Sequence, residues 1–355
     1  MPLALHSRVI KAAALVGSGL AAYTRTKRAG EVTLLGFHGL CENVGDLGIL
    51  DWSLHLPVSG FRSICALLAS DYRVISMADL IESRKHGTKL PDNAAIITFD
   101  DGYASNYELA FPILKKFGLP ASIYVTTGFL DSEDMLWFQR VDLALGRTQK
   151  PTIDWKINGK KLRMLLVTRE QRQQSLVHLI PELKELSDAD LLHEVCRLEE
   201  MLGVKTPGPD DLPQVMRPMT WDMAREMSAS GQIEIGGHTH THPILARCDS
   251  IAMRAEIFTC RDRIREELGT MPLTFAYPNG GQDDFTQETM SLVKEAGFQA
   301  ACSAINGRVD DQSSLLQLPR YGTPESIWEA EATLSGAYET LKDWRQSCLK
   351  AMSMI

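Results

Sequence analysis

The sequence predicts an α/β protein built as an incomplete (β/α) barrel with a mostly helical insertion. Short apolar runs typical of buried strands alternate with segments of helical periodicity, and this alternation implies a parallel sheet. Several of the runs end in acidic or histidine residues, and a (β/α) barrel carries its active site at the carboxyl ends of its strands. A long polar stretch, residues 131–216, interrupts the alternation and is mostly helical in period.

The expected strands and helices follow one another along the chain. Each strand is a short apolar run, and each helix has apolar residues spaced three or four apart. The helix expected after strand 94–99 ends at Gly118, a residue typical of helix C-termini. The expected strands are 32–37, 72–76, 94–99, 121–125, 233–236, 273–277, 299–303 and a short one near 316–318. The expected helices are 61–68, 78–83, 106–117, 221–228, 250–268 and 287–296, with 170–179 and 188–201 inside the insertion.

Three regions are expected along the chain. They are an N-terminal basic amphipathic helix in residues 1–30, the barrel in 31–323 with its insertion at 131–216, and a C-terminal helix in 324–355. In the first region a mildly apolar run, 12–22, lies between basic residues and is far short of the ~20 apolar residues that a membrane-spanning helix needs. We favour a helix that packs on the domain or touches a membrane surface. A frayed terminal helix and a weak secretory signal are the alternatives.

The composition argues against some partners and compartments. Lys plus Arg is 37 and Asp plus Glu is 45, so the net charge of −8 offers no basic field for nucleic-acid phosphates. The seven cysteines are scattered and include no Cys-x-x-Cys pair, which disfavours a thiolate zinc site and a disulfide framework. We therefore expect a protein that is cytoplasmic or peripheral to the inner membrane, with secretion as the alternative. The sequence gives no indication of an oligomeric state.

The most informative segment is Thr98–Gly102. In it, Asp100 and Asp101 follow the apolar run of the expected strand 94–99. Two adjacent carboxylates at the end of a buried strand are costly unless a cation or a proton shares the site. The pair therefore predicts a cation site at this end of the sheet.

Two histidines that can bind a cation occur further along the chain. His238 and His242 are spaced four apart in the segment Gly237–Pro243, which follows another apolar run. A tight loop or one helical turn brings both rings to one side, and Pro243 favours the loop. One Asp with two His binds a metal ion and leaves positions open for water and substrate, while the other Asp is free to act as a base. His240 is expected to point away, either supporting the ligand residues from behind or having a purely structural role.

The two motifs resemble those of the polysaccharide deacetylase family, the NodB-homology carbohydrate esterases. Thr98–Gly102 matches the first family motif, and residues 238–243 match the second, His-Ser/Thr-x-x-His-Pro. A variant form of the third motif is present in residues 275–280. The resemblance extends more weakly from about residue 32 to about residue 321. It implies a distorted (β/α)7 barrel and a divalent metal cofactor, for which zinc is the expected ion.

The resemblance also implies roles for the motif residues. Asp101, His238 and His242 would bind the metal, and Asp100 would be the catalytic base. A bound metal lowers the pKa of its water toward ~7 and polarises the acetyl carbonyl. The alternative for Asp100 is that it only orients a metal ligand or caps the following helix.

The third motif departs from the common family form. Ala276 replaces an arginine that positions the base in the family, and Asn279 replaces a tyrosine. The main-chain N–H of Asn279 remains a candidate donor to an oxyanion. We expect Arg320, at the end of the last expected strand, to pair with Asp100 instead. A surface arginine in a loop is the alternative.

The general acid is missing from its usual place in the family, because no histidine follows His242. His38 ends the first expected strand, in a Phe37–Leu40 segment that resembles the Tyr-His motif of a family branch acting on bacterial exopolysaccharide. The resemblance implies that His38 protonates the leaving amine. A buried structural histidine is the alternative.

The leading interpretation is a metal-dependent hydrolase whose substrate is an N-acetylated glycan. It would remove N-acetyl groups from amino sugars of a bacterial surface polysaccharide or glycolipid. A related amidohydrolase on another C–N bond and a catalytically silent glycan-binding protein are the alternatives. The insertion 131–216 is interpreted as a cap over the substrate groove, because Trp137 and Phe138 stand near its start. A plain surface insertion is the alternative.

Overall fold

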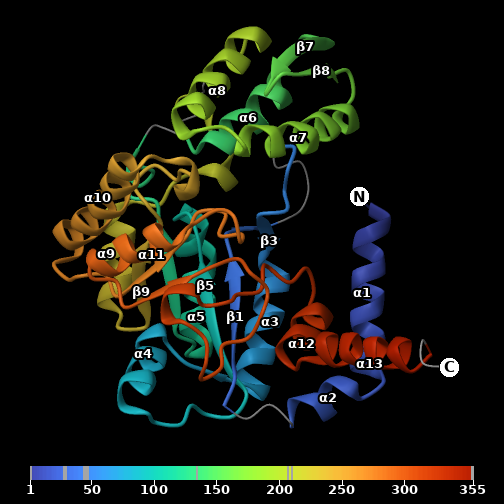
Figure 1. Ribbon diagram of the computed structural model, residues 1–355, viewed down its shortest axis with the longest axis vertical. Helices are drawn as coiled ribbons and strands as arrows, with labels where there is room; N and C mark the ends of the chain where they lie inside the picture. Colours follow the sequence, from blue (N-terminus) through green and yellow to red (C-terminus); the bar gives the residue numbers. More distant parts are fainter. Residues whose placement is uncertain are drawn as a thin grey trace.

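The computed structural model describes residues 2–26, 30–42, 48–132, 135–205, 208 and 211–352 (Figure 1). Within these ranges, the side chains of residues 2–7, 345 and 348–352 are not described. The ends of the predicted terminal regions, residues 1, 27–29 and 353–355, lie outside the described residues.

The core of the fold is a curled, seven-stranded parallel sheet, which confirms the predicted barrel class. Its main path runs β1-β5-β6-β9-β10-β11, and β4 pairs with the start of β5. All residues of the neighbouring strands β1 and β5 are buried, as the continuous apolar runs predict. The strands are β1 (Val32–Phe37), β4 (Arg73–Val74), β5 (Ala94–Phe99), β6 (Ala121–Val125), β9 (Ile233–Gly237), β10 (Thr274–Ala276) and β11 (Ala300–Cys302).

The sheet closes through single bridges instead of a last strand. Leu318 bridges to Cys302 of β11, and Tyr321 bridges to Leu35 of β1, both in the parallel sense. The strand predicted near 316–318 is therefore wrong, because Leu315–Gln317 forms a 3₁₀ turn. Pro319 has no N–H to donate to a ladder, which prevents a continuous strand between the two bridges.

Helices cover the outside of the sheet, and their apolar faces form its core. The rings of Phe37, Phe61 and Phe99 lie 5.3 to 5.5 Å from one another between β1, β5 and α3. The helix predicted at 106–117 begins as a π-helical turn, Asn106–Ala110, before α5 starts. The helices are α3 (Val58–Asp71), α4 (Met77–His86), α5 (Phe111–Phe117), α9 (Trp221–Ala229), α10 (Ser250–Leu268) and α11 (Gln287–Glu295).

The insertion folds around a hydrophobic core of its own above the upper ends of the strands (Figure 1). It contains α6 (Trp137–Arg147), α7 (Arg169–Lys184) and α8 (Asp188–Leu202). It also contains an antiparallel hairpin of β7 (Thr152–Ile157) and β8 (Lys160–Leu165), which the sequence analysis did not predict. Asn158 and Gly159 form the turn with φ angles of 51° and 74°, and Asn-Gly is the strongest short-range signal for such a hairpin.

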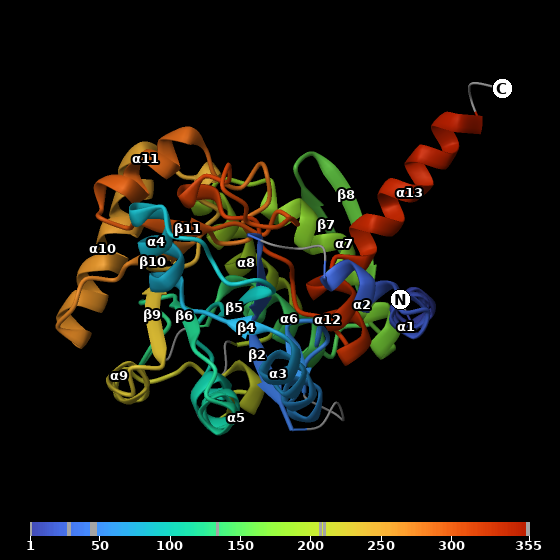
Figure 2. The same ribbon diagram turned by 90° about the horizontal axis from the view of Figure 1, so that it is seen from below.

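The two ends of the chain form a helical layer on the flank of the barrel (Figure 1). It consists of α1 (Pro2–Gly17), α2 (Leu20–Arg25), α12 (Ile327–Leu334) and α13 (Ala337–Met352). Arg8 of α1 pairs with the buried Glu329 of α12 at 2.6 Å. The predicted single C-terminal helix is wrong, because Gly336, with a φ of 78°, separates two helices. The second, α13, projects away from the body (Figure 2). Among the described residues, no helix is both long and apolar enough to cross a bilayer.

Candidate active site

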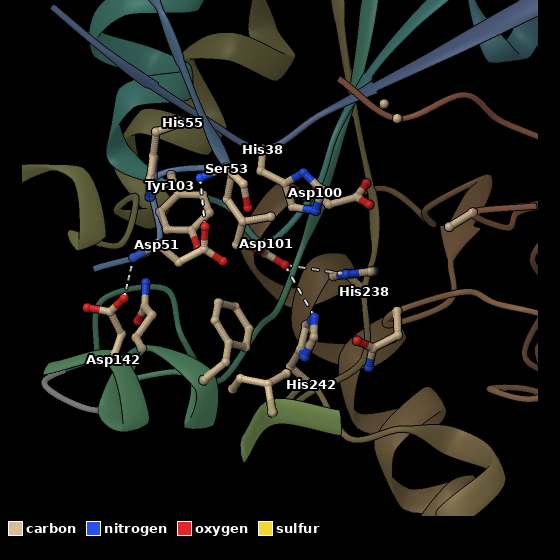
Figure 3. Close-up of a pocket in the computed structure, with 18 of the residues that line it drawn as sticks. His38, Asp51, Ser53, His55, Asp100, Asp101, Tyr103, Asp142, His238 and His242 are labelled. Atoms are coloured by element: carbon tan, nitrogen blue, oxygen red, sulfur yellow. Dashed lines mark hydrogen bonds and ion pairs between the residues drawn. The ribbon is translucent and has the colours of Figure 1, made fainter. Parts of the chain in front are cut away.

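A cavity of about 340 Å³ lies at the carboxyl ends of the strands, beneath the insertion (Figure 3). Every residue proposed from the sequence as catalytic or metal-binding lines it. These residues come from segments far apart in the chain, and the strand ends of one parallel sheet bring them together. They are His38, Asp100, Asp101, His238, His242 and Arg320.

Asp101, His238 and His242 form one buried cluster. Oδ1 of Asp101 lies 3.4 Å from Nε2 of His238 and 3.4 Å from Nε2 of His242 (Figure 3). Asp101 follows β5 in a left-handed conformation, with a φ of 75°. Such strained backbone is typical of functional sites.

The backbone around the two histidines fixes how their rings face. Nδ1 of His238 lies 2.7 Å from the carbonyl oxygen of Ala276, so it carries the proton and leaves Nε2 free toward Asp101. The main-chain N–H of His242 donates to the Thr239 hydroxyl at 3.0 Å in a tight loop. The loop that Pro243 predicted is therefore present, with φ angles of 65° at Thr239 and 66° at His242.

The electrostatics of the cluster fit a divalent metal ion. Both carboxylate oxygens of Asp101 are buried without a conventional hydrogen-bond partner, and the three ligand atoms lie within 4.8 Å of one another. Burial by itself raises the pKa of Asp101, but the contacts with His238 and His242 outweigh it and hold the pKa well below its usual value. The buried carboxylate is therefore ionised, and a bound cation would compensate its charge. One carboxylate and two imidazoles form a common ligand set for zinc and related metals.

Asp100 and Arg320 form a bidentate ion pair, the pairing that the sequence analysis proposed. Nη1 of Arg320 donates to Oδ1 of Asp100 at 2.7 Å, and Nη2 donates to Oδ2 at 2.6 Å. The side chain of Arg320 packs against Gly36 on its way to Asp100. A Cβ atom at position 36 would lie 3.1 Å from Nε of the arginine. Burial alone raises the pKa of Asp100, but the Arg320 guanidinium outweighs it and lowers that pKa. Asp100 is thus an ionised acceptor beside the metal cluster.

His38 and Asn279 present unpaired polar atoms at the cavity. Nδ1 of His38 is buried without a partner, and its carbonyl oxygen accepts a hydrogen bond from the Asn106 amide at 2.6 Å. Nδ2 of Asn279 is likewise buried without a partner. The side-chain amide of Asn279 is therefore a second candidate donor, besides the main-chain N–H predicted from the sequence.

His240 lies outside the cluster, as expected for a structural residue. Its Nδ1 lies 3.0 Å from the Thr127 hydroxyl, and its main-chain N–H donates to Glu256 at 2.8 Å. These contacts hold the loop that carries His238 and His242.

His55 is a residue of the cavity that the sequence analysis missed. It belongs to β3 (His55–Pro57), which pairs with β2 (Gly39–Cys41) in a two-stranded sheet at the mouth of the barrel. The centroid of its ring lies 5.3 Å from the centroid of the Tyr103 ring, in an edge-on contact. The ring also packs against Gly39, where a Cβ atom would lie only 2.2 Å from Nδ1 of His55. Burial, followed by the nearby His38, lowers the pKa of His55 to about 4, so the ring is neutral near pH 7. Its place at the cavity depends on the pairing of β3 with β2, for which the sequence carries no local signal.

The insertion supplies one wall of the cavity, which agrees with a cap. The ring of Phe138 meets the ring of His242 at 5.4 Å. The carboxylate of Asp142 accepts the main-chain N–H groups of Leu50 at 2.9 Å and Asp51 at 2.7 Å (Figure 3). Burial raises the pKa of Asp142 to about 6. Through these contacts the insertion reaches both a metal-cluster histidine and the loop in front of β3.

Comparisons with known proteins agree with the geometry. The family model for polysaccharide deacetylases matches residues 87–301. The poly-beta-1,6-N-acetyl-D-glucosamine N-deacetylase of Escherichia coli K12 is 44% identical over 80 residues, which are 22% of this chain and 12% of that protein. The matched segment is therefore a small part of that relative's length.

Two solved structures share the fold. The Streptococcus pyogenes deacetylase PplD, in complex with acetate, superimposes with a TM-score of 0.56 and 15% identity, covering 86% of this chain and 99% of its own. IcaB from Ammonifex degensii has a TM-score of 0.53 and 17% identity, and the match covers 87% of this chain and 98% of the IcaB chain. At such identities these likenesses concern the fold alone.

Proposed function

Because the chain belongs to the polysaccharide deacetylase family, we propose that it removes N-acetyl groups from amino sugars of a bacterial surface polysaccharide or glycolipid. The observation that carries this proposal is the position of the Asp100–Arg320 ion pair directly beside the cluster of Asp101, His238 and His242 in one cavity. An ionised base and a metal-ligand set at one point are the two parts that hydrolysis of an unactivated amide needs.

The cofactor in this proposal is a divalent metal, with zinc as the expected ion. Asp101, His238 and His242 would hold it, and it would supply a Lewis acid for the acetyl carbonyl and a water of lowered pKa. Nε2 of His238 and Nε2 of His242 each lie 3.4 Å from Oδ1 of Asp101, close enough for all three residues to hold one ion.

The residues around the cluster have separate tasks. Asp100 accepts a proton from the attacking water, and Arg320 keeps its carboxylate oriented and ionised. Asn279 offers its amide N–H to the developing negative charge on the acetyl oxygen. His38 gives a proton to the departing nitrogen as the C–N bond breaks. The products are acetate and a free amine.

Acetate release from N-acetylglucosamine oligomers tests the proposal. We expect release that a chelator abolishes and that added Zn²⁺ restores. Release from other amides but not from N-acetylated sugars would favour a related amidohydrolase. Binding of the oligomers without any acetate release, even with metal restored, would favour a catalytically silent glycan-binding protein.

Peripheral contact with the inner membrane is a separate part of the proposal. The first 28 residues contain five basic and no acidic residues, whereas the whole chain has a net charge of −8. Arg8 and Arg25 pair with acidic residues of the protein, so the other three basic residues would provide the attraction to anionic lipid. Co-sedimentation with phosphatidylglycerol vesicles tests the contact, and equal recovery with phosphatidylcholine vesicles would contradict it.

A further inference from the structure

Lys184 is a charged residue of the cavity to which the mechanism gives no task. It is the last residue of α7, and Leu176, Ile180 and Lys184 line the cavity together. Residues spaced four apart share one face of a helix, so α7 presents two apolar side chains and then an ammonium group to the cavity.

The Lys184 amine has no partner among the described residues. Within the described part of the chain, no carboxylate lies within 4.0 Å of it, and no hydrogen-bond acceptor contacts it. Burial lowers the pKa of this amine, and Asp284 opposes that effect from a longer distance. Asp284 itself accepts the main-chain N–H of Gly281 at 2.8 Å.

Two other charged groups of the cavity already have partners within the protein. Asp100 neutralises Arg320, and the carboxylate of Asp142 accepts main-chain N–H groups. Outside the cavity, Lys160 pairs with Glu182 of the same helix at 2.7 Å. A half-buried lysine that lines the cavity, with no carboxylate within 4.0 Å among the described residues, suits an anion.

A helix C-terminus also favours a lysine through the helix dipole, which is the structural explanation for this residue. However, the carbonyl of Lys184 is already met by the guanidinium of Arg247 at 3.3 Å. The dipole explanation therefore predicts a loss of stability on substitution, whereas an anion site predicts a loss of selectivity for charged substrates.

We propose that Lys184 binds an anionic group of the substrate, so that the preferred substrate is an N-acetylated amino sugar carrying a phosphoryl or carboxylate group. This inference rests on the proposed deacetylase function. The cavity volume of about 340 Å³ lies at the small end of the usual range for ligand sites, roughly 300–1,000 Å³, which suits one sugar with one such substituent.

The kinetic test compares matched substrates. Acetate release is measured on methyl N-acetylglucosaminide, N-acetylglucosamine 1-phosphate, N-acetylglucosamine 6-phosphate and N-acetylmuramic acid. The wild type should prefer at least one anionic sugar over the neutral one by about tenfold or more in kcat/KM. Lys184→Met should bring that ratio close to one, Lys184→Arg should keep most of it, and the control Lys160→Met should keep all of it. Comparing the two sugar phosphates with N-acetylmuramic acid shows whether the preferred anionic group is a phosphoryl or a carboxylate group.

A binding test separates this inference from the proposed function. In the Asp100→Asn background, calorimetry measures binding of the preferred anionic sugar with and without Lys184→Met. A roughly tenfold or greater loss of affinity supports the anion site even if no acetate is ever released. Equal affinity, or an unchanged substrate ratio with a lowered melting temperature, overturns it and leaves the helix-dipole role. Acetate release that ignores substrate charge would overturn it while the deacetylase assignment stands.

Discussion

Arg320 holds both carboxylate oxygens of Asp100, at 2.7 and 2.6 Å, across 220 residues of chain. The pair places a positioning arginine on the segment that closes the barrel, while Ala276 occupies the position in the third motif where the family commonly has its arginine. The proposed base is thus paired with an arginine from the segment between the two closing bridges, and not with one from the third motif.

The first prediction tests whether Asp100 acts as the base and not as a metal ligand. Asp100→Asn should keep its metal but lose acetate release by about 10²–10⁴-fold, because only the proton acceptor is removed. Arg320→Lys should lose less, because a lysine keeps the charge but not the bidentate geometry. Metal content and kcat of both variants check this. Substantial activity in Asp100→Asn would show that another group takes the proton.

The second prediction concerns the metal cluster. Asp101→Ala, His238→Ala and His242→Ala should each lose most bound metal, because each removes one of three ligands. His240→Ala is the matched control from the same loop and should retain it, since that ring contacts Thr127 and not the cluster. Elemental analysis of purified proteins decides. Full metal retention in the His242 variant would overturn the ligand set.

The third prediction concerns the insertion wall. Phe138→Ala should raise KM for N-acetylglucosamine oligomers more than it lowers kcat, because we expect this wall of the cavity to contact substrate. Deleting the whole insertion is a poorer test, because Phe138 packs on His242 at 5.4 Å and its loss would also expose the cluster. Leu192→Ala, on an exposed face of α8, is the control and should leave KM unchanged. If Phe138→Ala loses metal, the residue acts by holding His242.

Much of the site could be predicted from sequence because each motif directly follows its own buried strand. Asp100, Asp101 and His238 reach the cavity through local strand ends alone. His55 could not be placed that way, because its position depends on the long-range pairing of β3 with β2, where it lies opposite Gly39. Chain-local periodicity carries no record of such a pairing.

The same limit explains two errors in the fold. Residues 315–321 carry strand-like apolar residues, but Pro319 and the 3₁₀ turn before it leave only isolated bridges. In the C-terminal region the helical pattern continues across Gly336, and only the left-handed conformation there reveals two helices.

The fourth prediction is a pH dependence of stability from Asp142. Its folded pKa of about 6 lies above the ordinary value of 3.8, because burial outweighs the N–H groups of Leu50 and Asp51. The negative charge of Asp51 raises the pKa of Asp142 further, whereas the positive charge of Arg169 lowers it. Between about pH 4 and 6 the folded protein therefore binds more protons than the unfolded chain, so this group makes stability fall as pH rises through that window.

Asp142→Asn should remove that part of the slope, which amounts to at most about 3 kcal/mol in the free energy of unfolding. Urea unfolding at pH 4, 5, 6 and 7 measures it. Asp154→Asn, an exposed aspartate on β7 of the same insertion, is the control. Identical slopes in wild type and Asp142→Asn would mean that Asp142 titrates in its ordinary range.

The last prediction tests His38 as the proton donor. His38→Ala should fold and bind metal, because His38 lines the cavity and is not one of the three residues of the cluster. It should deacetylate N-acetyl sugars about 10²-fold or more slowly, because an amine leaves poorly unless it is protonated. A phenolate leaves without that help. An aryl acetate ester should therefore lose much less rate in this variant than an N-acetyl sugar does.

His55→Phe is the matched control, since it changes the neighbouring histidine of the cavity, which is neutral near pH 7. It should affect ester and amide in the same proportion, because a neutral, buried ring has no proton to give at that pH. Proportional loss on both substrates in His38→Ala would mean that His38 only shapes the cavity. Loss on neither would place the acid elsewhere, and the buried, unpaired Nδ1 of His38 would then have no part in the reaction.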